Sequence, residues 1–127
     1  MLSKKILVID DDPIFCFILQ KLLSKHDLNA YRTFHLATDA FTFLTSMDAP
    51  QEEYLIFLDI NMPVMNGWEF LDLIQKTNGI NSIQVAVITS SIDPADQEKA
   101  RSYSCVIDLI KKPVDSMHLK HIFEQTL

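Results

Sequence analysis

Short apolar runs alternate with amphipathic helical stretches along the whole chain, and this alternation restricts the possible folds more than any other feature. The apolar runs predict strands at Lys5–Ile9, Asn29–Phe34, Tyr54–Leu58, Gln84–Ile88 and Val106–Ile110. The amphipathic stretches predict helices at Asp12–Lys25, Leu36–Ser46, Asn66–Thr77, Asp93–Ser102 and Asp115–Gln125. Strands that alternate with helices favour an α/β fold, in which a doubly wound parallel sheet is covered on both faces through right-handed crossovers.

The bulk composition narrows the class of protein. A length of 127 residues fits a single domain, residues 1–127, and we expect no output domain. The net charge of −6 provides no electrostatic footprint for nucleic acid, so we expect no direct DNA binding. The run Ile6–Ile9 is too short for a signal peptide, and no run reaches the roughly 20 apolar residues that span a bilayer. We therefore expect a cytoplasmic protein without membrane insertion, and two isolated cysteines agree with a reducing compartment.

Glycine is scarce, which excludes two common phosphate-binding motifs. The chain contains only Gly67 and Gly79. A dinucleotide-binding fingerprint needs three closely spaced glycines, and a P-loop needs a Gly-Lys-Ser/Thr sequence after a strand. Neither kind of nucleotide site is compatible with this sequence.

Polar side chains follow four of the predicted strands at the point where each strand ends. These strand ends carry Asp10-Asp11-Asp12, Asp59, Thr89-Ser90-Ser91 and Lys111-Lys112-Pro113. In an open parallel sheet, sites form beyond the carboxyl ends of the strands, where the strand order reverses. One crevice is therefore expected to hold carboxylates, a hydroxyl and an ammonium group.

Three carboxylates in one crevice repel one another and cannot all stay ionised without a cation. One divalent cation and one lysine would balance the charges of Asp10, Asp11 and Asp59. Carboxylate and carbonyl oxygens suit Mg²⁺, which also binds phosphate oxygens. His118 and His121 lie three residues apart but lack further ligands, so we expect ordinary surface histidines there. A site of this kind is prepared for a phosphoryl group, with Asp59 as the nucleophile that forms an acyl phosphate.

Four short segments together resemble the receiver domains of two-component response regulators, and the similarity covers nearly the whole chain. They are the acidic opening Ile6–Pro13, the phosphoacceptor segment Leu58–Gly67, the hydroxyl strand Val87–Ser90 and the lysine turn Lys112-Pro113. Each segment is short, but four of them in the expected order are specific. The resemblance implies a five-stranded parallel sheet of order 2-1-3-4-5 with five helices, as in flavodoxin-like folds.

The resemblance also implies how the carboxylates act. Asp59 would accept a phosphoryl group from the phosphohistidine of a histidine kinase or a histidine phosphotransfer protein. Asp11, Asp59 and the backbone carbonyl of Asn61 would bind Mg²⁺, and Asp10 would assist indirectly through water.

The remaining polar residues would bind and sense the phosphoryl group. The resemblance assigns a phosphoryl oxygen to Lys112, while we expect its neighbour Lys111 to point outward. Thr89, with Ser90 beside it, would reorient toward the phosphoryl group and bias the following loop and helix toward a second state. The family often has an aromatic switch residue three positions before the lysine, but this chain has Leu109, so we expect an altered readout.

The first predicted helix leaves two apolar residues outside its core-facing stripe. The stripe consists of Phe15, Ile18, Leu19, Leu22 and Leu23. Ile14 and Phe17 lie off this stripe, and exposed apolar pairs can mark docking surfaces. Because this helix meets the kinase or phosphotransfer domain in receiver domains, we expect Ile14 and Phe17 in that contact. The fourth helix offers only Ala95, Ala100 and Tyr103 to the core, which predicts low local stability.

Three functions are compatible with these residues. The leading interpretation is a stand-alone receiver that switches protein–protein interactions and is not an enzyme for external substrates. An aspartyl-phosphate phosphohydrolase commonly has a second Asp two residues after the nucleophile, where this chain has Asn61. A pseudo-receiver would bind partners without phosphorylation, and the complete set of Asp11, Asp59, Thr89 and Lys112 argues against it. Asn61 and Ser91 flank the expected path of attacking water and would tune the lifetime of the phosphorylated state.

Overall fold

A five-stranded parallel sheet organises the chain in the computed structural model, which describes residues 5–26, 31–46, 53–77, 83–90 and 92–126. The strands are β1 (Lys5–Ile9), β2 (Tyr31–Phe34), β3 (Tyr54–Asp59), β4 (Ile83–Thr89) and β5 (Val106–Lys111). The helices are α1 (Pro13–Lys25), α2 (Ala37–Thr45), α3 (Gly67–Lys76), α4 (Pro94–Arg101) and α5 (Ser116–Thr126). The strand order β2-β1-β3-β4-β5 confirms the predicted fold class and topology. Asn29, the predicted start of the second strand, and Ser91 lie outside the described residues.

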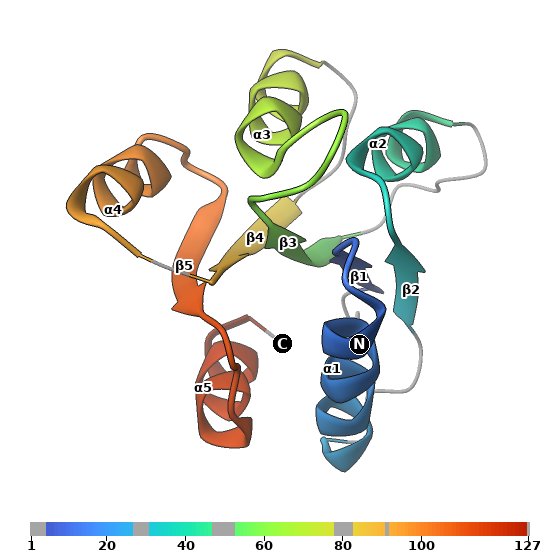
Figure 1. Ribbon diagram of the computed structural model, residues 1–127, viewed down its shortest axis with the longest axis vertical. Coiled ribbons are helices and arrows are strands. Elements are labelled where there is room, and N and C mark those ends of the chain that lie inside the picture. The colour runs from blue at the N-terminus through green and yellow to red at the C-terminus, as the bar shows by residue number, and fades with distance from the viewer. Residues whose placement is uncertain (1–4, 27–30, 47–52, 78–82, 91, 127) are drawn as a thin grey trace.

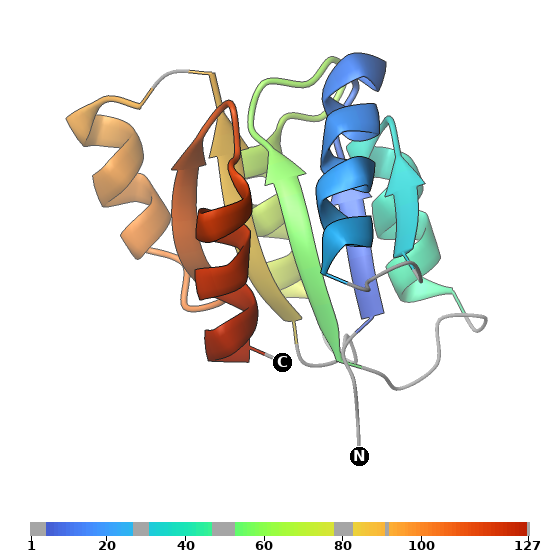
Figure 2. The same ribbon diagram turned by 90° about the horizontal axis from the view of Figure 1, so that it is seen from below.

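The helices form two layers, one on each side of the sheet (Figure 1). α1 and α5 cover one face, as Figure 2 shows, and α2, α3 and α4 cover the other. Each layer has its own apolar cluster against the sheet, and the central strand β3 is buried at every position. Such burial on both faces explains why β3 is a continuous apolar run rather than an alternating one.

The chain reverses its direction of travel across the sheet at β1. α1 leads to β2 on one side of β1, whereas α2 carries the chain back to β3 on the other side. Loops leaving β1 and β3 therefore diverge, and in open parallel sheets such a reversal marks the crevice in which ligands bind. This is the place where the sequence predicts the site.

Side-chain caps fix where α1, α3 and α4 begin. Asp12 accepts a hydrogen bond from the backbone N–H of Ile14 at 2.9 Å, and Asp93 caps α4 in the same way. Asn66 and Glu69 form a reciprocal capping box at the start of α3. Removing such a cap costs about 1 kcal/mol. The predicted Asp-Pro helix starts are confirmed.

The prediction of core positions was wrong for two residues, Ile18 and Ala95, which are exposed. Ile18 was expected in the core stripe of α1, but 45% of its surface is exposed, because it lies at the edge of the stripe one turn after Ile14. Ala95 is also exposed, because α4 packs on the sheet only near its C-terminal end, through Ala100 and the following Tyr103. Within the described ranges, no helix has the length and apolar character needed to cross a bilayer.

Candidate functional site

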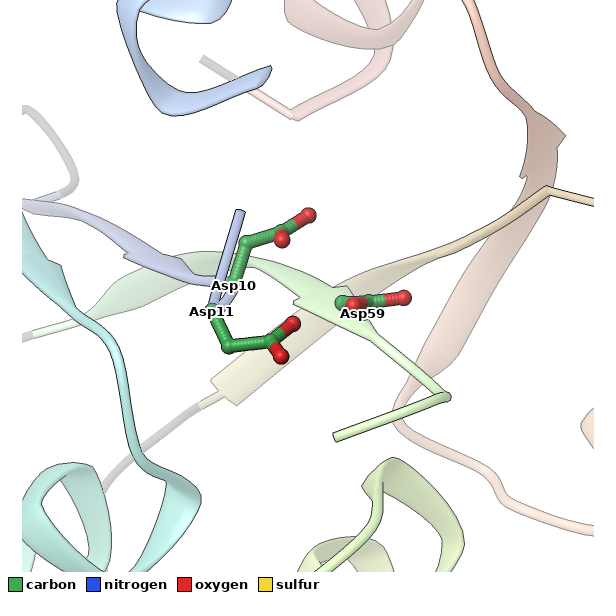
Figure 3. A group of neighbouring side chains, drawn as sticks. All are labelled: Asp10, Asp11 and Asp59. Atoms are coloured by element: carbon green, nitrogen blue, oxygen red, sulfur yellow. The ribbon is translucent and has the colours of Figure 1, made fainter. Parts of the chain in front are cut away.

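Three carboxylates meet at the carboxyl ends of β1 and β3. One oxygen each of Asp10, Asp11 and Asp59 lies within 4.8 Å of the other two (Figure 3). Asp10 and Asp59 are buried, whereas Asp11 is exposed at the rim of the crevice. The sequence prediction that these three residues come together is confirmed in its geometry.

The pairing of β1 with β3 explains the cluster. Ile9 lies opposite Leu58 in the parallel register, so the next residues, Asp10 and Asp59, emerge side by side. The strands are held in the apolar core, so the two carboxylates are delivered from rigid elements.

Hydrogen bonds fix the orientation of Asp10. The backbone N–H of Asp12 donates to Asp10 Oδ1 at 2.8 Å. The Asp10 carbonyl lies 3.0 Å from His35 Nδ1 and accepts a contact from the Cys16 thiol at 3.5 Å. Sequence analysis assigned no role to Cys16 and His35, because nothing local in the sequence links them to Asp10.

The turn from β3 into α3 brings the helix start against the Asp59 backbone. Gly67 N–H donates to the Ile60 carbonyl at 2.8 Å. A Cβ atom at Gly67 would lie 2.7 Å from the Asp59 carbonyl oxygen and 2.8 Å from Ile60 Cα. Only glycine permits this approach. In the same turn, Val64 has a φ of 69°, which is strained for a β-branched residue.

Lys112 supplies the ammonium group that the charge balance requires. Its Nζ lies 2.9 Å from Asp10 Oδ2 and 4.0 Å from Asp59 Oδ2. Asp10 Oδ2 is fully buried and has no hydrogen bond of good geometry, so this ion pair is its charge compensation. Burial alone would lower the pKa of Lys112, but its short contact with Asp10 and the charges of Asp10 and Asp59 raise this pKa. Lys112 is therefore a permanent cation in the site.

Without a metal ion, the surroundings of Asp59 disfavour its ionised form. Burial and then the charge of Asp10 raise the pKa of Asp59 from 3.8 to about 7. Lys112 and the backbone N–H of Asn61, which donates to Asp59 Oδ1 at 3.3 Å, lower it by less. One lysine therefore does not balance the three carboxylates, and a further cation would stabilise the ionised form of Asp59. The donor set of carboxylates and backbone oxygens fits Mg²⁺.

β4, the strand that carries Thr89, ends beside the three carboxylates. Asp59 pairs with Ile88, so Thr89 is the next residue of β4, and it is buried. The Thr89 carbonyl accepts a hydrogen bond from Lys112 N–H at 2.8 Å, which ties the ends of β4 and β5 together. Ser90 follows at an exposed bend. Lys111 is exposed, as predicted.

The other predicted residues lie away from the carboxylates. Ile14 and Phe17 are 70% and 57% exposed on α1, and Ile18 joins them on the same surface. Leu109 is half-buried on β5 and packs against the cluster under α2 and α3. His118 is not a free surface histidine, because its Nε2 lies 2.8 Å from Asp108 Oδ2.

Besides Cys16 and His35, sequence analysis missed a further residue that contacts the site. Lys112 Nζ lies 4.3 Å from the centroid of the Phe15 ring. The helical stripe assigned Phe15 to the core, which is correct, since it is buried. The stripe could not show that the ring also faces the ammonium group, because that depends on how α1 and the end of β5 meet.

Comparison with protein families identifies the chain. Residues 6–124 match the family model of the response regulator receiver domain. An uncharacterized response regulatory protein of Staphylococcus epidermidis is 32% identical over 120 residues, which cover 94% of this chain and 45% of the relative. Hybrid signal transduction histidine kinase G of Dictyostelium discoideum is 31% identical over 123 residues, 95% of this chain and 3% of the kinase. The chain thus spans less than half the length of these relatives.

Solved structures agree over the full fold. A two-component response regulator from Cytophaga hutchinsonii is similar with a TM-score of 0.84 and 29% identity, covering 98% of this chain and 97% of that one. A response regulator receiver protein from Dyadobacter fermentans gives a TM-score of 0.83 and 28% identity, with 97% of each chain covered. The family match, the fold and the acidic crevice lead to one assignment: the chain belongs to the receiver domain family of two-component response regulators.

Proposed function

We propose that Asp59 accepts a phosphoryl group from the phosphohistidine of a partner protein in a Mg²⁺-dependent reaction, and that phosphorylation switches the protein–protein interactions of the chain. One observation carries this proposal: the buried Asp59 carboxylate lies within 4.8 Å of the Asp10 and Asp11 carboxylates and 4.0 Å from the Lys112 ammonium. The arrangement combines a nucleophile with groups that bind a cation and an anion.

The metal would be held by oxygen ligands. The Asp11 and Asp59 carboxylates and the Asn61 carbonyl would bind it directly, and Asp10 would act through water. When bound, Mg²⁺ would neutralise carboxylate charge and bind an oxygen of the phosphoryl group. The pKa of about 7 at Asp59 supports this assignment, because the site without metal disfavours the ionised nucleophile.

The transfer itself needs little covalent machinery from the protein. A carboxylate oxygen of Asp59 attacks phosphorus, and the bond from phosphorus to the partner's imidazole nitrogen breaks. The imidazole nitrogen keeps the electron pair and leaves as neutral imidazole, since its other nitrogen carries a proton. The Lys112 ammonium donates to a phosphoryl oxygen, and the Thr89 hydroxyl turns to donate to another. The product is an acyl phosphate whose added charge the site must balance.

We propose that the chemistry stays on the chain's own Asp59 and that the chain is not an enzyme for external substrates. Asn61 occupies the position at which phosphohydrolases of this chemistry have an acid/base Asp. An amide cannot donate and recover a proton in that role. Its backbone instead hydrogen-bonds the Asp59 carboxylate.

The phosphoryl donor is proposed to be a histidine kinase or a histidine phosphotransfer protein that docks on α1. Ile14, Phe17 and Ile18 form an exposed apolar surface on this helix, which begins at Pro13, directly after the acidic run Asp10–Asp12. The downstream target is proposed to be another protein, because the net charge of −6 disfavours direct binding of nucleic acid.

Acetyl phosphate and Mg²⁺ test the reaction at Asp59. We expect a labile phosphoryl adduct on the intact protein by mass spectrometry, no adduct for Asp59→Asn, and little for Asp11→Asn. Absence of an adduct from the unchanged chain would favour a pseudo-receiver. Rapid turnover of unrelated phosphate esters would favour a phosphohydrolase.

Phe17→Ala tests the docking surface. We expect phosphotransfer from the partner to slow by about 10-fold, because aromatic anchors contribute about 1 kcal/mol or more to interfaces. Labelling by acetyl phosphate should not change, since Phe17 does not contact the site. Gln20→Ala, at an exposed position of the same helix, is the matched control. Unchanged transfer to the Phe17→Ala chain would disprove the assignment.

A further inference from the structure

The Phe15 ring and the Lys112 ammonium form the shortest cation–ring contact among the described residues. The ring centroid lies 4.3 Å from Nζ. Phe15 is buried, and the Lys112 side chain is only 20% exposed. Attraction between a cation and a ring face grows when water is excluded from the pair. This contact is therefore stronger than an exposed one such as Lys21 over Phe17, at 5.2 Å.

Two rigid elements create the contact. Phe15 is the third residue of α1, whose start is fixed by Pro13 and the Asp12 cap. Lys112 follows β5 directly, and its backbone N–H is bonded to the Thr89 carbonyl at the end of β4. Neither partner can shift without disturbing a helix start or a strand end. The ring is therefore a fixed platform for the ammonium group.

A ring face differs chemically from a carboxylate as a partner for lysine. Asp10 Oδ2, 2.9 Å from Nζ, attracts the ammonium through its charge and adds that negative charge to the crevice. The Phe15 ring attracts the same cation without adding a full charge and without accepting a strong hydrogen bond. The ammonium group has three N–H donors, and Nζ lies 4.0 Å from Asp59 Oδ2, so donors are available beside Asp59.

We propose that Phe15 is a positioning residue for phosphoryl transfer: its ring holds Lys112 Nζ where the remaining N–H groups can donate to an anionic oxygen group on Asp59. This inference rests on the function proposed above. It assigns to a core residue of α1 a part in orienting the cation of the site. Phe15 touches Lys112 and not the reacting atoms, so it acts through the lysine.

Stepwise fluorination of the Phe15 ring separates positioning from packing. Fluorine withdraws electron density from the ring face and changes its volume little. We expect the rate of Asp59 labelling at saturating acetyl phosphate and Mg²⁺ to fall with each added fluorine, reaching about 3- to 10-fold for the trifluoro ring. The same series at Phe70 is the control, since this buried ring lies on the opposite face of the sheet with no described cation over it. There the rate should stay constant.

A second measurement needs no phosphorylation. In NMR spectra of the metal-free chain, the methylene protons beside Lys112 Nζ should show an upfield ring-current shift. Phe15→Leu should remove this shift, and Asp59→Asn should keep it, because the ring contact does not involve Asp59. Absence of the shift in the unchanged chain would overturn the inference.

The two measurements together assign any failure. If the Phe15→Leu chain labels slowly but the fluorinated chains label at the normal rate, Phe15 only packs and the inference is overturned. If the unchanged chain forms no adduct at all, both proposals are overturned. A ring-current shift that is still present in that case shows that the Phe15–Lys112 contact exists and that the proposed phosphorylation is what failed. A graded loss at Phe15 with none at Phe70 supports the inference.

Discussion

Two regions of the molecule, the β1–β3 crevice and the edge of the sheet formed by α4 and β5, are built in opposite ways. At the crevice, β3 is buried at every position, and Asp10, Asp59 and Thr89 are held in fixed places by strand pairing. At the edge, β5 is mostly half-buried, and Ala100 is the only residue of α4 that is buried. Preorganisation suits a reaction centre, whereas weak packing suits an element that changes position.

The α4–β5 edge is also incompletely filled. A cavity of about 210 Å³ lies between α4 and β5 and is lined in part by Ala100, Val106 and Leu109. The main attachment of α4 beyond Ala100 is Tyr103, which follows the helix. Tyr103 stacks on Trp68 with ring centroids 6.0 Å apart and donates a 2.7 Å hydrogen bond to Asp72. The helix is therefore attached to α3 at its C-terminal end, while its N-terminal end follows β4.

Gly67→Ala would break the crevice and is expected to have the largest effect. The new Cβ would meet backbone atoms of Asp59 and Ile60 at 2.7 and 2.8 Å, and backbone cannot yield without displacing the Asp59 carboxylate. We expect a loss of about 2 to 4 kcal/mol in the free energy of unfolding, measured in urea, and slower labelling by acetyl phosphate. Gln75→Ala, exposed on the same helix, should cost less than about 0.5 kcal/mol. A Gly67→Ala chain as stable as this control would contradict the close approach.

Asp59→Asn should stabilise the metal-free protein, with an effect that depends on pH. In the unfolded chain the Asp59 pKa is near 3.8, and in the fold it is about 7. Between these values the folded protein holds a proton that the unfolded chain releases, so stability falls as pH rises from about 4 to about 7. The side-chain amide of the Asp59→Asn variant cannot ionise, so the variant does not lose this stability. We expect its free energy of unfolding to exceed that of the unchanged chain by about 1 to 3 kcal/mol at pH 8.

Urea unfolding in EDTA at pH 4.5 and pH 8 measures this difference. The gain from Asp59→Asn should be small at the lower pH and large at the higher one. Excess Mg²⁺ should stabilise the unchanged chain at pH 8 and should stabilise the Asn variant much less. A gain that does not grow with pH would show that the strain of the crevice has another source.

The crevice was predictable because its residues are placed by local patterns. An apolar run predicts a strand, and polar residues at the strand ends predict a shared site beyond the sheet. The strand order that brings Asp10, Asp11, Asp59 and Lys112 together was implied by the resemblance to receiver domains. Asp-Pro pairs likewise predicted the helix starts. None of these steps requires knowledge of how one side chain meets another across the core.

The contacts between elements were not predictable for the same reason. Ile18 was placed in the core because helical spacing gives the width of a stripe only approximately. The contacts of Cys16 and His35 with the Asp10 carbonyl, and of Phe15 with Lys112, depend on side-chain directions set by three different elements. A polar residue beside a reactive strand end is visible in sequence, but its neighbours from other elements are not.

Tyr103→Phe would loosen the α4–β5 edge and is expected to have a moderate effect. It removes the hydrogen bond to Asp72 but keeps the ring that stacks on Trp68. We expect the free energy of unfolding to fall by about 1 kcal/mol. Amide exchange should be faster in α4 than in α3, and exchange in the strands of the crevice should not change. A double-mutant cycle with Asp72→Asn isolates the pair. Equal exchange in α3 and α4 of the unchanged chain would remove the contrast between the two regions.

Val64→Gly should have the smallest effect and the opposite sign. Val64 is 83% exposed, so its side chain contributes little packing, while its φ of 69° is unfavourable for a β-branched residue. Glycine adopts this φ without strain but gains freedom in the unfolded chain, so we expect a net gain of about 0.5 to 1 kcal/mol. Val64→Ala keeps a Cβ and should gain less. If the glycine chain is no more stable than the unchanged chain, the backbone strain at Val64 is no larger than the entropic cost of glycine.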